Sequence, residues 1–357
     1  MTVQSPSRYA HSGLSSTSFL SAIRLPHDFL HSYGIVISLV LLVAVVTIAD
    51  PAFLSLTNIA NMIGQWAPAG IMAVAMTYVV IARGFDLSLA SGFSLCAITA
   101  ATIAAQGTST PLAFAAALGV GIAIGCFNAL LVCGLSINPF IATVGTGFIL
   151  LGLDIITTPN TYITVEEAGF DRLGAGTWHG MYYKGMLLIA FLVAGEFVLA
   201  KTRFGQYLYA IGGNPEASRF SGLYVRTLTG LTYVFSGFTM GVAGILAASQ
   251  LSSAQAQMEP TIVFDVIAIV VLGGTSLAGG FGAIWRTAVG LAIIATISNG
   301  FTLLGLNPFY QSIVKGTVII LAVAFEGWAR RLAAARLAKE IATEPTPLLG
   351  LDERTSA

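Results

Sequence analysis

The chain has 357 residues, of which 56% are hydrophobic and only 9% are charged, and its formal net charge is zero. A soluble domain carries about 25% charged residues, so most of this surface cannot face water. The neutral balance gives no reason to expect a nucleic-acid partner, and long apolar stretches argue against the short alternating segments of a β-barrel. The composition predicts an all-α polytopic membrane protein surrounded by the lipid bilayer.

The N-terminal residues 1–30 are polar and Ser-rich, which predicts a disordered cytoplasmic tail. The apolar run from Tyr33 to Ala49 follows. No A-x-A cleavage site comes after it, and Asp50-Pro51 does, which favours an uncleaved first span. A signal peptide is the competing interpretation. We expect a transmembrane domain over 31–328 and a cytoplasmic C-terminal tail over 329–357.

Further apolar segments bring the expected total to about ten spans. Residues 53–64 fit a short re-entrant or interfacial helix capped by Thr57 or Asn58. One later segment, 262–275, is too short to cross about 30 Å of hydrocarbon alone, so it needs its flanks or is a broken helix. The later spans are predicted at 65–82, 87–106, 112–134, 140–158, 185–200, 228–249, 262–275, 287–305 and 309–327.

The distribution of Lys and Arg predicts the orientation. With ten spans and the N-terminus inside, the basic loops at Arg83, 201–226 and Arg286 all lie on the cytoplasmic side, together with both termini. The largest outer loop, 159–184, has more acids than bases.

The polar run 201–226 contains one predicted short helix. Asn214 is a suitable N-cap, and Pro215 suits the first helical position. Glu216 complements the positive end of the helix dipole, and Gly222 can adopt the left-handed conformation that ends the helix. A helix of about eight residues is only ~12 Å long, and its stability alone in water is marginal. We therefore expect a partner protein in the cytoplasm to hold it.

A short internal repeat is visible. Leu135–Phe140 and Leu304–Phe309 both contain Asn-Pro-Phe, and each follows an Asn, at 128 and 299. In the predicted topology the first copy links spans 4 and 5, and the second links spans 9 and 10. Because five spans separate the copies and five is odd, they would have opposite orientations in the membrane, which predicts an inverted repeat as in many transporters.

Three Gly-rich segments interrupt the apolar pattern, at 83–88, 212–214 and 272–282. Irregular backbone at membrane depth is tolerated only where protein or a watery cavity covers it. These glycines therefore either allow close helix packing and tight turns or line a pathway. None of the segments has the Lys and following Ser or Thr of a phosphate-binding loop, so nucleotide binding is not predicted.

Ionisable residues within apolar segments are candidates for function. Asp265 and Lys315 both lie about one to two turns inside the outer face, and we predict that they form a buried ion pair because either charge alone would be uncompensated. The others lie near predicted span ends, where water at headgroup level accounts for them: Asp86, Asp154, Glu196 and Glu326.

No catalytic or cofactor-binding constellation is visible, so we do not expect an enzyme. The His residues lack metal-ligand spacing, and no base is placed beside a Ser or Thr nucleophile. The three cysteines lie in apolar runs as small packing residues: Cys96, Cys126 and Cys133.

Several segments together resemble one known family, the permease subunit of ribose/xylose-type ABC sugar importers in the branched-chain amino acid/ribose permease superfamily. The resemblance covers nearly the whole membrane region. The matching segments are Gly84–Ser88, Asn138–Thr146, Tyr209–Arg219, Asp265–Ala268, Gly273–Gly280 and Val314–Gly316. The chain departs from the family at Arg83-Gly84-Phe85, where Gly-Gly-Ile is usual, and at Arg286, where Gly is common.

The resemblance implies a type II ABC importer-like fold, a multi-pass location in the bacterial inner membrane and a monosaccharide or polyol substrate. It implies a cytoplasmic ATPase, a periplasmic sugar-binding protein and a second permease copy, in a homodimer or a pseudo-dimer. It also implies an ATPase-coupling segment, formed here by Asn214, Glu216, Ala217, Ser218, Arg219, Phe220 and Gly222.

Two questions stay open at this level. Polar groups that either border the substrate path or pack between helices are Asn128, Asn138, Thr143, Gln255 and Asn299. The alternative function is a stand-alone ion-coupled secondary sugar carrier, which the inverted repeat and the charged residues Asp86, Asp265 and Lys315 would also suit.

Overall fold

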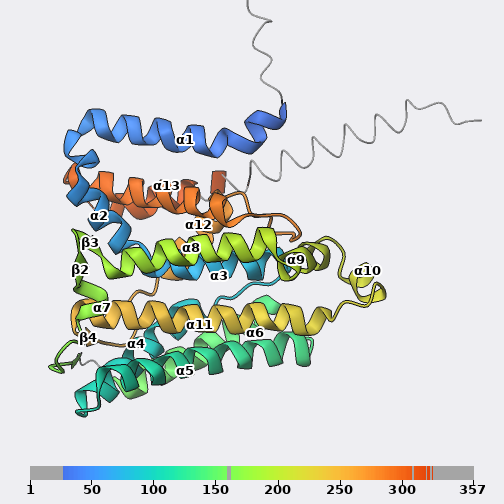
Figure 1. The fold of residues 1–357 in the computed structure, drawn as a ribbon, viewed down its shortest axis with the longest axis horizontal. Coiled ribbons are helices and arrows are strands. Elements are labelled where there is room, and N and C mark those ends of the chain that lie inside the picture. Colours follow the sequence, from blue (N-terminus) through green and yellow to red (C-terminus); the bar gives the residue numbers. More distant parts are fainter. Residues whose placement is uncertain (1–26, 159–161, 308, 319, 322–323, 325–357) are drawn as a thin grey trace, which may run out of the picture.

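The computed structural model describes residues 27–158, 162–307, 309–318, 320–321 and 324. Most of this is helical, and the long helices run side by side along one axis (Figure 1). The principal helices are α1 (His27–Ala49), α2 (Leu56–Gln65), α3 (Ala67–Ile81), α4 (Leu89–Ala105), α5 (Thr110–Ala129), α6 (Pro139–Thr157), α8 (Tyr183–Lys201), α9 (Arg203–Gly213), α10 (Pro215–Phe220), α11 (Val225–Leu251), α12 (Ile262–Leu272) and α13 (Ile284–Leu303).

Shorter elements cap the bundle. A 3₁₀ turn, Pro51–Leu54, precedes α2, and a π-helical turn, Leu130–Gly134, extends α5. α7 (Arg172–Ala175) lies between two antiparallel pairs of short strands. The pairs are β1 (Ile163–Thr164) with β4 (Ser253–Ala254), and β2 (Thr177–Trp178) with β3 (Met181–Tyr182).

The centre of the bundle is α3, in which every residue is buried. A helix that is apolar on all sides is stable only when neighbours surround it. α11 packs against α3, α4 and α5, and its approach to α5 depends on glycine. A Cβ at Gly237 would overlap the carbonyl oxygen of Gly121. The small residues therefore let these two backbones approach closely, as in other membrane helix pairs.

The described residues contain five helices long and apolar enough to cross a membrane, or six if the bent pair α2–α3 counts as one span. These are fewer than the ten spans predicted, because α1 over 34–49, α4 and α12 fall short of full spanning length. α12 ends at Leu272, so the segment 262–275 is indeed a short helix. The last predicted span, 309–327, lies partly outside the described residues.

Two local predictions need correction. Residues 27–30 belong to α1 instead of a disordered tail. The cap of α2 is Ser55, not Thr57 or Asn58, because the Ser55 hydroxyl accepts a hydrogen bond from the Asn58 backbone N–H at 3.3 Å. The Asn58 side chain instead donates to the Phe53 carbonyl at 2.9 Å.

The two copies of the Asn-Pro-Phe repeat have the same local function. Asn138 caps α6 and accepts from the Phe140 N–H at 3.0 Å. Asn307 likewise accepts from the Phe309 N–H at 3.0 Å. The shared cap accounts for the repeated motif, and the inverted relation between the halves stays a prediction.

Candidate functional site

The predicted short helix is present and its ends are capped as the sequence indicates. Asn214 precedes α10 in extended conformation, and its Oδ1 accepts from the Ala217 N–H at 3.0 Å. Gly222 has φ +85, and the Leu223 N–H donates to the Ser218 carbonyl at 3.1 Å. This pattern is a Schellman ending, which needs a residue in the left-handed region.

α10 projects from one end of the molecule, whereas α7 and the short strands lie at the opposite end (Figure 1). Phe220 and Tyr224 are each 81% exposed, and the Arg219 guanidinium lies 5.5 Å from the Phe220 ring centre. Large exposed aromatic side chains beside a charge are typical of a protein-binding surface. Ser218 is the one coupling candidate that is buried, which fixes α10 on the bundle.

A buried polar network lies behind this end of the bundle, centred on Asp86 between α3 and α4. Asp86 Oδ1 accepts from the Ser88 hydroxyl at 2.6 Å and from the Asn128 amide at 3.3 Å, and Oδ2 accepts from the Ser236 hydroxyl at 2.7 Å. Every described partner of the carboxylate is a donor. The network therefore fastens the α3–α4 connection to α5 and α11.

The prediction that water at headgroup level solvates the acids at span ends is wrong for Asp86 and Asp154, since both are 0% exposed. Asp154 lies on α6 beside Ser94 of α4. The Glu196 carboxylate accepts a hydrogen bond from the backbone N–H of Trp285 at 3.0 Å. Glu326 lies outside the described residues.

The five candidate path residues have separate hydrogen-bond partners and do not share one network. Asn128 belongs to the Asp86 network, and Thr143 donates to the Pro139 carbonyl at 2.8 Å. Asn299 and Asn58 exchange hydrogen bonds at 2.9 Å. Asn138 caps α6, and the Gln255 carbonyl accepts from the Ser94 hydroxyl at 3.4 Å. A packing role fits Asn128, Thr143 and Asn299, because each has a protein partner, and the path assignment stays a prediction.

Asp265 and Lys315 lie close together. Lys315 Nζ is 2.8 Å from Asp265 Oδ1 and 4.9 Å from the centre of the Trp66 ring. Their side chains are 20% and 17% exposed, so the pair is half-buried at the edge of the bundle, not in its centre. The nearby carboxylate and indole ring both compensate the charge of the ammonium.

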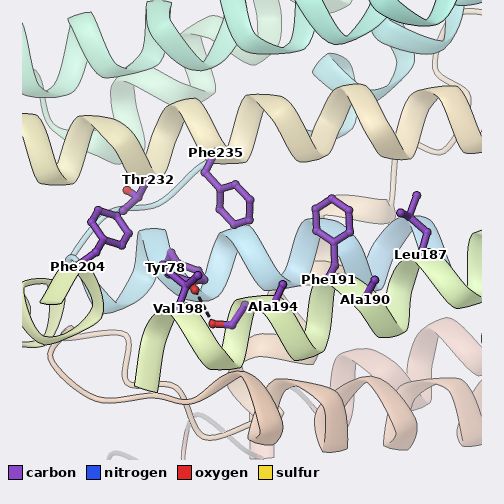
Figure 2. Close-up of a pocket in the computed structure, with 10 residues that line it drawn as sticks. Tyr78, Leu187, Ala190, Phe191, Ala194, Val198, Phe204, Thr232 and Phe235 are labelled. Carbon is purple, nitrogen blue, oxygen red and sulfur yellow. Dashed lines mark hydrogen bonds between the residues drawn. The ribbon is translucent and has the colours of Figure 1, made fainter. Parts of the chain in front are cut away.

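A groove of about 490 Å³ lies between α8 and α11, with Tyr78 of α3 at its floor. Figure 2 shows the rings of Phe191, Phe204 and Phe235 around it. The Tyr78 hydroxyl donates a hydrogen bond to the Gly195 carbonyl at 2.6 Å, so it is not free to bind a ligand. Because its lining offers almost no free polar group, this groove does not suit a sugar, whose hydroxyls need hydrogen-bond partners.

Sequence reasoning missed the partners of Asp86 and the role of Arg83. Ser88 and Ser236 look like ordinary membrane-helix serines, and only the fold brings them to one carboxylate. The sequence marks Arg83 as a topology signal and as a departure from the family pattern, and it predicts neither of the carbonyls that the side chain binds. Its position three residues before Asp86, in a Gly-rich break, is the one signal that would have pointed to it.

Comparisons with known proteins agree with this architecture. The ribose import permease protein RbsC of Escherichia coli K12 is 38% identical over 80% of this chain and 91% of its own length. RbsC of Bacillus subtilis 168 is 36% identical over 82% and 92%. The galactose/methyl galactoside import permease protein MglC of Escherichia coli K12 is 32% identical over 88% and 97%. No solved structure matches the chain.

The family model for the branched-chain amino acid transport system / permease component matches residues 58–323. This range begins in α2 and includes the Asp86 network, the α9–α10 segment and both residues of the Asp265–Lys315 pair. With the long apolar helices and the capped helix at one end of the bundle, the match leads to one conclusion: the chain is a multi-pass membrane protein that belongs to this permease family.

Proposed function

We propose that this chain is the membrane-spanning permease subunit of an ATP-binding-cassette importer for a monosaccharide or related polyol. The relatives named above are import permeases for ribose and for galactose or methyl galactoside. The observation that carries the mechanism is α10, a capped helix that presents Phe220 outside the bundle, with the exposed Tyr224 directly before α11. Energy from a separate ATPase would enter through this helix.

In this mechanism, an ATPase dimer closes on binding ATP and moves α10 in each of two permease copies. A periplasmic sugar-binding protein supplies substrate at the opposite end, where α7 and the two short strand pairs lie. The spans then alternate between outward and inward access. The proposal places the chain in the bacterial inner membrane with both termini in the cytoplasm and assigns the permease domain to residues 31–328.

Reconstitution tests the proposal against a stand-alone carrier. Liposomes that contain the chain alone should move no sugar, with or without a proton or sodium gradient. Liposomes that also contain the ATPase, with binding protein outside, should accumulate sugar only when ATP is supplied. Sugar uptake by the chain alone on an ion gradient would overturn the proposal and favour the carrier.

A further inference from the structure

Three breaks in the helical pattern meet beside the base of α10. The last turn of α9 contacts the end of α3 so closely that a Cβ at Gly212 would overlap the Ile81 carbonyl oxygen. That same oxygen accepts from the Gly280 N–H at 2.9 Å, in the connection between α12 and α13. The three Gly-rich segments of the sequence, distant along the chain, therefore form one junction.

Arg83 spans this junction. Its Nε donates to the Gly212 carbonyl at 2.6 Å, and its Nη2 donates to the Gly213 carbonyl at 2.7 Å. These two carbonyls belong to the last turn of α9, where the helix dipole also attracts a cation. The guanidinium plane holds two donors in a fixed fork, so both bonds constrain direction as well as distance.

The backbone of Arg83 is also unusual, with φ +64. A side chain disfavours this left-handed region, and a non-Gly residue persists there only where surrounding contacts hold it. Arg83 is the left-handed residue of a Schellman ending of α3, since the Gly84 N–H donates to the Val79 carbonyl at 2.8 Å and the Arg83 N–H donates to the Val80 carbonyl at 2.9 Å. These backbone bonds hold the positive φ, and the side-chain bonds from Arg83 then fasten the α3–α4 connection to α9.

We propose that Arg83 is a positioning residue that transmits motion of α10 to the interior of the bundle, an inference that rests on the proposed function. α10 begins at Pro215, directly after the carbonyls that Arg83 binds. On the other side, Asp86 fastens the same connection to α5 and α11 through Asn128 and Ser236. A displacement of α10 therefore reaches the centre of the bundle through Arg83.

A second bond makes the junction stiff. The Tyr209 hydroxyl on α9 donates to the Gly282 carbonyl at 2.6 Å, so α9 is also fastened to the α12–α13 connection. Burial, with the Glu196 carboxylate nearby, raises the pKa of Tyr209 to about 12, so this phenol stays protonated and donating at neutral pH. α9 is therefore bonded to two helix connections: to the α12–α13 connection through Tyr209, and to the α3–α4 connection through Arg83.

The test compares variants in the assembled transporter, with ATPase and binding protein present. Arg83→Gly removes the side chain and also relieves the left-handed backbone. We expect it to keep or raise Tm and to bind the ATPase normally. Sugar moved per ATP hydrolysed should fall at least about tenfold, the factor that corresponds to one charge-assisted hydrogen bond. Arg83→Lys should restore part of this ratio, since it keeps the charge but loses the fork.

The matched control is Arg226→Gln. Arg226 is an exposed basic residue at the start of α11 with no ion pair among the residues described, and its substitution should leave the ratio unchanged. An Arg83→Gly protein with a wild-type ratio would overturn the proposal, and so would one that fails to bind the ATPase, since Arg83 would then serve assembly instead. Loss of ATP-driven uptake by the wild type would instead refute the proposed function itself.

Discussion

At the scale of single residues, a carboxyl group is buried inside the bundle where donors surround it. Asp86 is fully buried, yet four bonds reach its carboxylate, from the Ser88 backbone and hydroxyl, Asn128 and Ser236. These bonds give hydrogen-bond partners to a carboxyl group that has no access to water. Removing the carboxylate would leave these buried donors without a partner, which would lower the free energy of unfolding.

Asp86→Ala should therefore lower the unfolding free energy by about 2 kcal/mol or more, because several buried donors become unsatisfied. Thermal unfolding of the purified protein in detergent would measure this as a lower Tm. Ser236→Ala is the matched control, since it removes one donor and leaves the other bonds in place, and its effect should be about 1 kcal/mol. Equal Tm values for Asp86→Ala and wild type would show that the network contributes nothing.

The Asp265–Lys315 pair predicts a coupled response. Lys315→Met alone leaves the Asp265 carboxylate half-buried without its partner, and Asp265→Asn alone leaves Lys315 without its ion pair, whereas the double substitution removes both charges. Either single variant should destabilise more than the pair of substitutions together, with a coupling energy of about 1 kcal/mol. Tm values for the four proteins of the cycle measure it. Additive effects would mean that the 2.8 Å contact between Lys315 and Asp265 contributes no coupling energy to stability.

At the scale of elements, the α9–α10 segment is the part most fully specified by local signals. Asn214, Pro215 and Gly222 fix where α10 begins and ends, as the sequence indicates. Six residues make an unstable helix in isolation, so the buried Ser218 and the junction below α9 must supply the rest. What the element presents outward is aromatic surface and charge.

Glu216→Lys should abolish ATP-driven uptake while the protein still inserts in the membrane, because it reverses a charge on the surface offered to the ATPase and opposes the α10 dipole. Deletion of 214–222 should do the same. Uptake in cells or proteoliposomes, with membrane content measured by immunoblot, checks both.

Gln206→Lys is the matched control for this change, as it introduces the same side chain at an exposed position on α9 outside the coupling segment. It should transport normally. Normal uptake by Glu216→Lys would rule out α10 as the coupling contact.

At the scale of the whole molecule, the two ends of the bundle differ in kind. One end carries α10 and the three helix breaks, and the other carries α7 and two small strand pairs (Figure 1). By the positive-inside rule, we predict that the first end faces the cytoplasm, because Arg83, Lys201 and Arg226 belong to segments at that end.

Single cysteines test this orientation after Cys96, Cys126 and Cys133 are replaced by Ala. A cysteine at Ser221, after α10, should react with an impermeant maleimide only once the membrane is opened. A cysteine at Thr177, in the exposed β2 strand, should react in intact spheroplasts. The reverse pattern would invert the topology and remove the ATPase contact with it.

The sequence alone determined the class of protein, the place and caps of α10 and the partnership of Asp265 with Lys315. Each follows from local chemistry: apolar runs that water excludes, cap residues beside the helix they end, and opposite charges that hydrocarbon penalises. The tertiary structure alone decided that Asp86 is buried among donors and that Arg83 joins α9 to the α3–α4 connection. Those contacts link residues 42 to 150 positions apart, and no periodicity or spacing in a single chain encodes which distant donor reaches which acceptor.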